Sequence, residues 1–377
     1  MRNKRRGRQW LVVILSVLIL ALIFLIIQSV NHAKTSHVKN VSKTEQIITQ
    51  NGFVQQNSPT MNELTGAKKK KLANINKKMS DNRHFGAYLG IVGDTPVFAG
   101  RNGYANRDKQ VGFKSSSTFL SGRYQEFLNN AIIIKLISEK KLSLSEKLTK
   151  YVPNNDETLK GITIKQLLTQ KPKYYATVKN LNTLDADKYS SLDKLNVTTK
   201  ATKINVSATS AIKEVLISKV LKKSYTSVVN KMLVDELGLS SIRINDNKHG
   251  YINDVLSYNE QLVGGVPSQT SVLKVKNIYF GTNQLRLSLS DIGASYRKIL
   301  TNKYFPKSYQ SLFLLSAKQL IFKKYDDSAF FYTADNNQSL IAQYNYKKDS
   351  LVVVGDNYPN GRLNIRQLEF QLNSLIK

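Results

Sequence analysis

The sequence predicts an α+β fold in which one antiparallel sheet is assembled from both ends of the chain. Strand-like runs gather near residues 85–100 and again near residues 329–355, and apolar residues at helical spacing fill the region between them. Helical patterns also flank both groups of strands, which predicts a sheet covered by terminal helices, with a helical subdomain inserted. Of the 377 residues, 41% are hydrophobic and 9% aromatic, a composition that can bury a core.

The N-terminal part of the predicted sheet is a hairpin preceded by a helix. A helical pattern after residue 67 places Leu72, Ile75 and Met79 on one face. Two strand patterns follow, over Phe85–Val92 and Pro96–Gly100, and a Gly-Asp-Thr turn separates them. This arrangement predicts two neighbouring strands of the main sheet.

The rest of the folded region is predicted as a helical block followed by a strand meander and a closing helix. Helical spacing of apolar residues occurs over Tyr124–Lys140, Ile164–Leu168, Ala208–Leu221, Thr226–Leu237 and Leu289–Leu300. The meander and the closing amphipathic helix are expected over Ala329–Thr333, Ser339–Tyr346, Leu351–Gly355 and Leu363–Ile376.

The N-terminus has the pattern of a membrane anchor. Five basic residues precede Leu11–Val30, which contains no ionisable side chain. Twenty helical residues span about 30 Å, the thickness of the hydrocarbon core, and the basic cluster should stay on the cytoplasmic side. A cleaved signal peptide is the alternative, but Ser29–Ala33 offers only a poor cleavage site. We therefore expect a cytoplasmic tail (1–10), a transmembrane helix (11–30), an extracytoplasmic linker (31–65) and a folded domain (66–377).

Charge and composition exclude several classes of function. The chain has 56 Lys and Arg against 26 Asp and Glu, a formal net charge of +30, and removing the five basic residues of the tail leaves +25 outside the membrane. No nucleic-acid-binding motif occurs and the expected location is extracytoplasmic, so we expect no nucleic-acid partner. The absence of cysteine excludes disulfides and Cys-ligated metals, and the four histidines lack metal-ligand spacing, so no metal or cofactor is predicted.

Four phrases, in order along the chain, resemble one enzyme family. They are Gly103–Asn106 with Ser117–Phe119, Lys141–Leu144 with Tyr151–Pro153, Ile162–Thr169, and Leu237–Leu239. Together they resemble the penicillin-recognising serine hydrolases, which include β-lactamases and low-molecular-weight penicillin-binding proteins. The resemblance covers about residue 66 to the C-terminus and implies a DD-peptidase/β-lactamase-like fold.

The resemblance also locates the positions at which this family does its chemistry. A nucleophilic serine at the start of a buried helix and a lysine three residues later are implied, and these positions fall on Arg123 and Glu126. Counting forward from Phe119 and backward from Lys141 gives the same register. Arginine has no oxygen with which to attack a substrate, so no acyl-enzyme can form at Arg123. The substituted pair is expected either as an ion pair in the pocket or as an exposed helical pair.

Two further motifs of the family are also altered. The Tyr-x-Asn loop matches the stretch that begins at Val206, where only Ser207 is kept and Ala208 replaces the asparagine. The Lys/His-Thr-Gly strand, which helps form the family's oxyanion hole, matches Tyr332, Thr333 and Ala334, so the cation and the glycine are lost.

These losses predict a catalytically inactive homologue that acts in binding or scaffolding at the cell wall. The anchor and the basic exported part fit a Gram-positive envelope, and the expected partners are the membrane, peptidoglycan, teichoic acid polymers or a cell-wall enzyme. The alternative is an active serine peptidase, esterase or β-lactamase that uses a non-standard serine, Ser121 or Ser207. Ser210 with Lys213 has the required spacing, but it lies on a different element of the family's pattern.

Overall fold

The computed structural model describes most of the predicted domain. The described residues are 64–151, 160–169, 175–178, 195–198, 206–245, 251–263, 266–272, 283–318, 320, 322–325, 327–358 and 363–376. The predicted transmembrane helix at 11–30 and nearly all of the predicted linker lie outside these residues. Within the described residues, no helix combines the length and the apolar character needed to cross a membrane.

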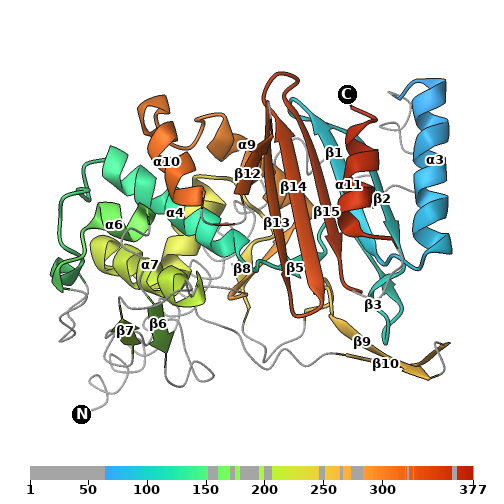
Figure 1. Ribbon diagram of the computed structural model, residues 1–377, viewed down its shortest axis with the longest axis horizontal. Helices are drawn as coiled ribbons and strands as arrows, with labels where there is room; N and C mark the ends of the chain where they lie inside the picture. Colours follow the sequence, from blue (N-terminus) through green and yellow to red (C-terminus); the bar gives the residue numbers. More distant parts are fainter. Residues whose placement is uncertain are drawn as a thin grey trace, which may run out of the picture. The chain divides into compact units, whose positions relative to one another are not determined.

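A six-stranded antiparallel sheet, in the order β12-β13-β14-β15-β1-β2, is the centre of the fold (Figure 1). The strands are β1 (Gly86–Val92), β2 (Thr95–Asn102), β12 (Phe322–Tyr325), β13 (Ser328–Asp335), β14 (Gln338–Asn345) and β15 (Ser350–Asp356). Strands from the two chain ends meet where β1 pairs with β15, with Gly86 opposite Asp356. The main sheet is therefore assembled from both ends of the chain, as the sequence predicts.

Helices α3 (Gly66–Asp81) and α11 (Ile365–Asn373) cover one face of the sheet (Figure 1). Successive residues of a strand point to opposite faces of the sheet, so every second side chain of these strands faces α3 and α11. The resulting small core contains Leu72, Ile75 and Met79 of α3, packed with Tyr88 and Val354 of the sheet. The predicted apolar face of the first helix is thus confirmed.

The opposite face packs against the helical block, which holds the larger core. Its helices are α4 (Tyr124–Ser138), α6 (Ile164–Thr169), α7 (Val206–Leu221), α8 (Tyr225–Val228), a π-helix (Val229–Asp235), α9 (Leu289–Leu300) and α10 (Gln310–Ala317). Helix α4 is buried on nearly all sides, because neighbours that include α7 and α10 pack around it. Short 3₁₀ turns occur at Leu148–Lys150 and Lys307–Tyr309.

Smaller sheets connect these layers. A three-stranded sheet orders β5 (Thr118–Leu120), β11 (Leu285–Ser288) and β8 (Arg243–Ile244). Three hairpins complete the described structure: β3 (Tyr104–Asn106) with β4 (Val111–Gly112), β6 (Tyr175–Val178) with β7 (Leu195–Thr198), and β9 (Tyr258–Val263) with β10 (Val266–Val272).

The predicted α+β architecture is confirmed, and the long elements lie within a few residues of their predicted bounds. Helix α10 and the three-stranded sheet were not predicted. Helix α10 is apolar around most of its circumference, and the strands of the small sheet have two to four residues, so neither shows a clear periodic pattern.

Candidate active-site position

The resemblance of the sequence places the family's nucleophile position at the start of helix α4. Strand β5 leads into it, and Gly122 makes the turn between strand and helix with a φ of +52°. A Cβ at this position would lie 2.7 Å from Oγ1 of Thr333, so the turn needs both the left-handed conformation and the small volume of glycine. Arg123 is the residue at the N-terminal end of α4.

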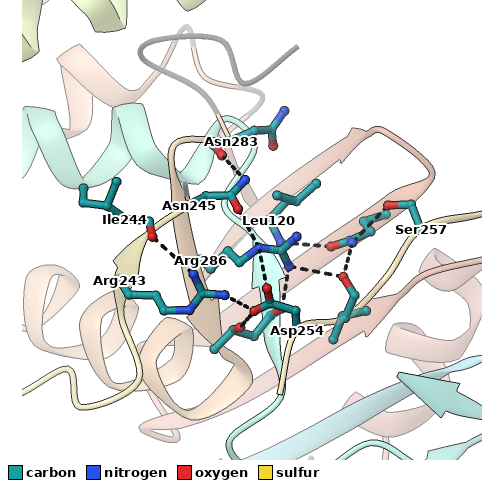
Figure 2. Close-up of polar contacts among 11 residues, drawn as sticks. Leu120, Arg243, Ile244, Asn245, Asp254, Ser257, Asn283 and Arg286 are labelled. Atoms are coloured by element: carbon teal, nitrogen blue, oxygen red, sulfur yellow. Dashed lines mark hydrogen bonds and ion pairs between the residues drawn. The ribbon is translucent and has the colours of Figure 1, made fainter. Parts of the chain in front are cut away.

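A buried polar network fixes strand β5 from the side. In Figure 2, Arg286 of β11 lies at its centre and donates to Oδ1 of Asn245 at 3.1 Å and to the carbonyl oxygens of Thr118 and Val255 at 3.1 and 3.2 Å. Its guanidinium also lies 3.7 Å from a carboxylate oxygen of Asp254. Burial lowers the pKa of Arg286 to about 10, so the side chain remains a cation at neutral pH. The network therefore holds β5, and with it the start of α4, in one position.

Backbone donors at the start of α4 are already used within the chain. The N–H of Arg123 donates to Oγ1 of Thr333 at 3.2 Å, and the N–H of Gly122 donates to Oδ1 of Asn283 at 3.0 Å. The amide of Asn283 in turn donates to Asp335, at the end of the same strand as Thr333. Two backbone N–H groups that could stabilise developing charge on a substrate oxygen are thus occupied by side chains.

Of the three residues matched to the Lys/His-Thr-Gly strand, only one lies next to the start of α4. Thr333 of β13 faces the start of α4, although 210 residues separate it from Arg123. The ring of Tyr332 packs on the other side of the sheet, 4.5 Å from the guanidinium of Arg366 in α11, and Ala334 is exposed. Alternation along β13 explains this difference, because neighbouring residues point to opposite faces. Tyr332, the residue assigned to the lost cation of the motif, therefore points away from Arg123.

Glu126, the residue expected at the position of the family's lysine, is fully buried, which excludes the exposed-pair alternative. Its carboxylate lies 2.6 Å from Nζ of Lys213, a residue of α7 that is also fully buried. Burial lowers the pKa of Lys213, and the charge of Glu126 opposes this effect. Burial likewise lowers the pKa of the half-buried Arg123, again opposed by Glu126. One carboxylate therefore lies within electrostatic range of two cations.

A second buried carboxyl group lies next to this pair. Burial raises the pKa of Glu214 well above its usual range and so favours its neutral form. Gln125 and Asn129 of α4 both donate to its Oε1. The hydroxyl of Tyr225 donates to Oδ1 of Asn129 at 2.7 Å. Polar side chains therefore fill the space between α4, α7 and α8 with hydrogen bonds.

The serines considered as nucleophiles lie in this buried interior. Ser121 is fully buried, and its hydroxyl donates to Oε1 of Gln125 at 3.2 Å. Ser210 is also fully buried, and its hydroxyl accepts from Asn129 at 3.1 Å. Ser207 and Ala208 belong to the first turn of α7, but their side chains lie outside the described part of the structure.

Lys213 and Glu214 were not predicted as members of this site. Two adjacent charged residues in the otherwise apolar run Ala211–Ile217 are the signal that indicates a buried polar contact there. The pairing of α4 with α7 that makes Lys213 the partner of Glu126 is a tertiary contact, which helical spacing alone does not give. Within the described ranges, no cluster of three or more His, Asp or Glu could hold a metal ion.

The fold is that of the β-lactamase and penicillin-binding-protein-like serine hydrolases. FmtA from Staphylococcus aureus superposes with a TM-score of 0.64 at 16% identity, over 89% of this chain and 96% of that one. A penicillin-binding protein from Bacillus halodurans gives 0.59 at 15%, over 80% and 98%. A class C β-lactamase gives 0.57 at 11%, over 82% and 97%. No family model matches the sequence, and no curated protein sequence matches it significantly.

Proposed function

We propose that this chain is a catalytically inactive relative of the serine hydrolases and acts as a binding or scaffolding domain at the outer face of a cell membrane. The observation that carries the proposal is Arg123 at the position of the nucleophile. A guanidinium cannot form an ester with substrate, and the backbone N–H beside it already donates to Thr333. The carboxylate of Glu126, at the position of the lysine base, is held by Lys213.

Location and ligand class follow from charge and from the N-terminal apolar segment. A retained helix at 11–30 would tether the domain, and the +25 charge of the exported part favours an anionic surrounding. Peptidoglycan stem peptides, teichoic acid polymers or an active cell-wall enzyme are the partners to test. The penicillin-binding proteins among the fold neighbours make peptidoglycan peptides the first choice.

Covalent labelling tests the loss of chemistry directly. The purified full-length protein is incubated with a labelled penicillin and with a fluorophosphonate, and its intact mass is measured beside an active class C β-lactamase. We expect no adduct on this chain. An adduct would overturn the proposal, and the variant Ser121→Ala would show whether Ser121 carries it.

Binding to isolated cell walls tests the proposed role. Wall preparations with and without teichoic acids are mixed with wild type and with Arg123→Gln at low and at high salt. Retention that persists without teichoic acids and weakens in the variant supports a role of the former catalytic position in binding peptidoglycan. If the protein is retained on neither preparation, the binding role fails.

A further inference from the structure

Helix α3 concentrates positive charge on its outer side. Six of its sixteen residues are lysines. The exposed ones are Lys69, Lys70, Lys71, Lys77 and Lys78. The single carboxylate of the helix, Asp81, pairs with Lys77 at 2.6 Å. A helix that faces only water usually mixes acidic and basic side chains three or four residues apart, which stabilises it. Helix α3 lacks this internal compensation.

The lysines also oppose the dipole of the helix. Lys68 and Lys69 lie near the start of α3, and its first turn has no acidic residue. Among the described residues, the side chain of Thr65 at the N-cap position makes no capping hydrogen bond. Cations near this end of a helix are unfavourable, because the dipole places partial positive charge there. An anionic surface against α3 would offset this cost.

A groove between α3 and α11 continues the positive surface. Its volume is about 420 Å³, and Gln371 lines it from α11. The charged residues that line it are Lys71, Lys77, Lys78 and Asp81. The acidic residue of α11 does not change this balance, because Glu369 is buried and accepts a hydrogen bond from Asn373. The groove therefore has the charge and the room to admit phosphate groups.

An exposed aromatic ring lies on the outer side of α11. Phe370 is 66% exposed, the highest value among the large hydrophobic residues that the structure describes. It precedes Gln371 of the groove, and α11 lies with α3 on the same face of the sheet (Figure 1). Lysines with an aromatic residue are typical of surfaces that bind membranes, because the cations attract anionic headgroups and the ring enters the interface.

We propose that the outer surface of α3 and α11 docks on a bilayer that contains anionic lipid headgroups. The inference rests on the location proposed above, the outer face of a membrane. Only the predicted linker at 31–65 separates α3 from the predicted transmembrane helix, so α3 is the first described helix after the membrane. Phe370 favours lipid over a water-soluble anionic polymer, because a polymer offers no apolar phase in which the ring could be buried.

Docking through this surface orients the rest of the domain. The helical block, which includes α4, packs on the face of the sheet opposite to α3 and α11. With α3 and α11 on the lipid, the helical block is turned away from the membrane. Cell-wall material could then reach it without passing between the domain and the bilayer.

Quenching of a single fluorescent label by lipid tests the contact. The chain has no cysteine, so one introduced cysteine can be labelled alone. Gln367→Cys places the label at an exposed position of α11, and the control Leu315→Cys places it at an exposed position of α10 in the helical block. The labelled full-length protein is reconstituted into phosphatidylcholine vesicles, with or without an equal amount of phosphatidylglycerol, that carry a quencher near the headgroups.

Phosphatidylglycerol should change the signal at one label only. We expect quenching at residue 367 to be about threefold stronger with phosphatidylglycerol than without it, and to return to the lower value at high salt. Quenching at residue 315 should be the same in both kinds of vesicle.

Charge variants test whether the lysines of α3 make the contact. A quadruple variant of α3 combines Lys70→Gln, Lys71→Gln, Lys77→Gln and Lys78→Gln. Its ratio of docked to undocked domain should fall about a hundredfold or more, because each lysine adds attraction to an anionic surface. A matched control makes the same changes at the exposed lysines Lys222, Lys223, Lys231 and Lys307 of the helical block. This control should dock as the wild type does.

A second pair of variants tests the aromatic ring. Phe370→Gln should lower the ratio of docked to undocked domain about threefold or more, because the ring no longer enters the interface. The control Ile252→Gln removes another exposed apolar side chain and should leave docking unchanged.

Flotation of the unlabelled protein with vesicles distinguishes this proposal from the proposed anchor. Flotation with pure phosphatidylcholine supports the anchor, because docking requires anionic lipid. If it fails while vesicles with phosphatidylglycerol still carry the wild type and not the quadruple variant, the anchor is wrong and docking is supported. Flotation with neither kind of vesicle overturns both.

Three other results overturn the docking proposal. The first is equal quenching at residue 367 with and without phosphatidylglycerol. The second is an equal loss of quenching in the quadruple variant and its control. The third is release of the quadruple variant from walls that contain teichoic acids without any quenching by lipid, since the lysines would then bind a polymer.

Discussion

Replacing Glu126 by glutamine is expected to destabilise the protein far more than the same replacement at Glu214. Both residues are fully buried, so the two variants change the same atoms in similar surroundings. Glu126 is the carboxylate of an ion pair with Lys213, whereas burial raises the pKa of Glu214 and favours its neutral form. Only the first replacement therefore removes a charge from the native state.

The size of the effect follows from the contacts of Glu126. Removing one partner of a buried ion pair costs about 3–5 kcal/mol, because the other charge stays buried without compensation. Glu126→Gln should cost about 4–5 kcal/mol, since Arg123 and Lys213 both lose the carboxylate that favours their charged forms. Lys213→Met should cost about 3 kcal/mol, because Arg123 still lies near Glu126. Glu214→Gln should change stability by less than about 1 kcal/mol.

Chemical denaturation followed by circular dichroism measures these differences in the free energy of unfolding. The double variant Glu126→Gln/Lys213→Met completes a cycle, and its cost should fall about 3 kcal/mol short of the sum of the two single variants. A loss of this size is a large fraction of a typical total stability of about 5–15 kcal/mol, so a shift in the denaturation midpoint should be easy to detect. Equal costs at Glu126 and Glu214, or additive costs in the cycle, would refute the assignment of the charges.

Four other predictions concern the dependence of stability on pH and the residues that hold the start of α4. Burial raises the pKa of Asp356 to about 7 and lowers that of His84 to about 4, from 3.8 and 6.5. As the pH rises from about 4 to 7, only the unfolded chain loses the Asp356 proton, which lowers stability by about 4 kcal/mol. Between about pH 4 and 6.5 only the unfolded chain loses the His84 proton, which raises stability by about 3 kcal/mol. The two contributions largely cancel in the wild type, so the stability of Asp356→Asn should rise with pH in this range and that of His84→Gln should fall; unfolding curves at several pH values check both. Arg286→Met should cost about 3 kcal/mol, since it leaves the Asn245 side chain and two carbonyl groups without their donor; an intact unfolding midpoint would contradict the role of this network. Gly122→Ala should cost about 2 kcal/mol through the left-handed φ and the contact with Thr333, and thermal unfolding would show it.

Periodicity predicted several of the long elements because they bury one face or one stripe. The predicted helix Leu289–Leu300 has the same bounds in the structure, and its apolar residues recur at helical spacing. The order of short phrases predicted that Arg123 lies at the start of a buried helix, and the structure has it there. The bounds of a helix and the order of short motifs are both properties of the local sequence, so residue patterns and spacing can predict them.

The contacts inside the site could not be predicted, because they join segments that are far apart in the chain. Lys213 meets Glu126 only through the packing of α7 on α4. Thr333 rather than Tyr332 faces Arg123 because of the alternation along β13, which the motif match did not fix. The raised pKa of Glu214 depends on burial, which the residue type alone does not reveal.

The pairing of β1 with β15 has a consequence for how the protein is made. The first hairpin of the sheet emerges early in synthesis, but its inner strand finds its neighbour only when residues 350–356 have appeared. Until then β1 has an unpaired edge, which is open to pairing with other chains. Contacts between such distant parts of a chain also form slowly. Truncation just before residue 350 should therefore yield insoluble material, even though Arg123, Glu126, Lys213 and Thr333 are all still present.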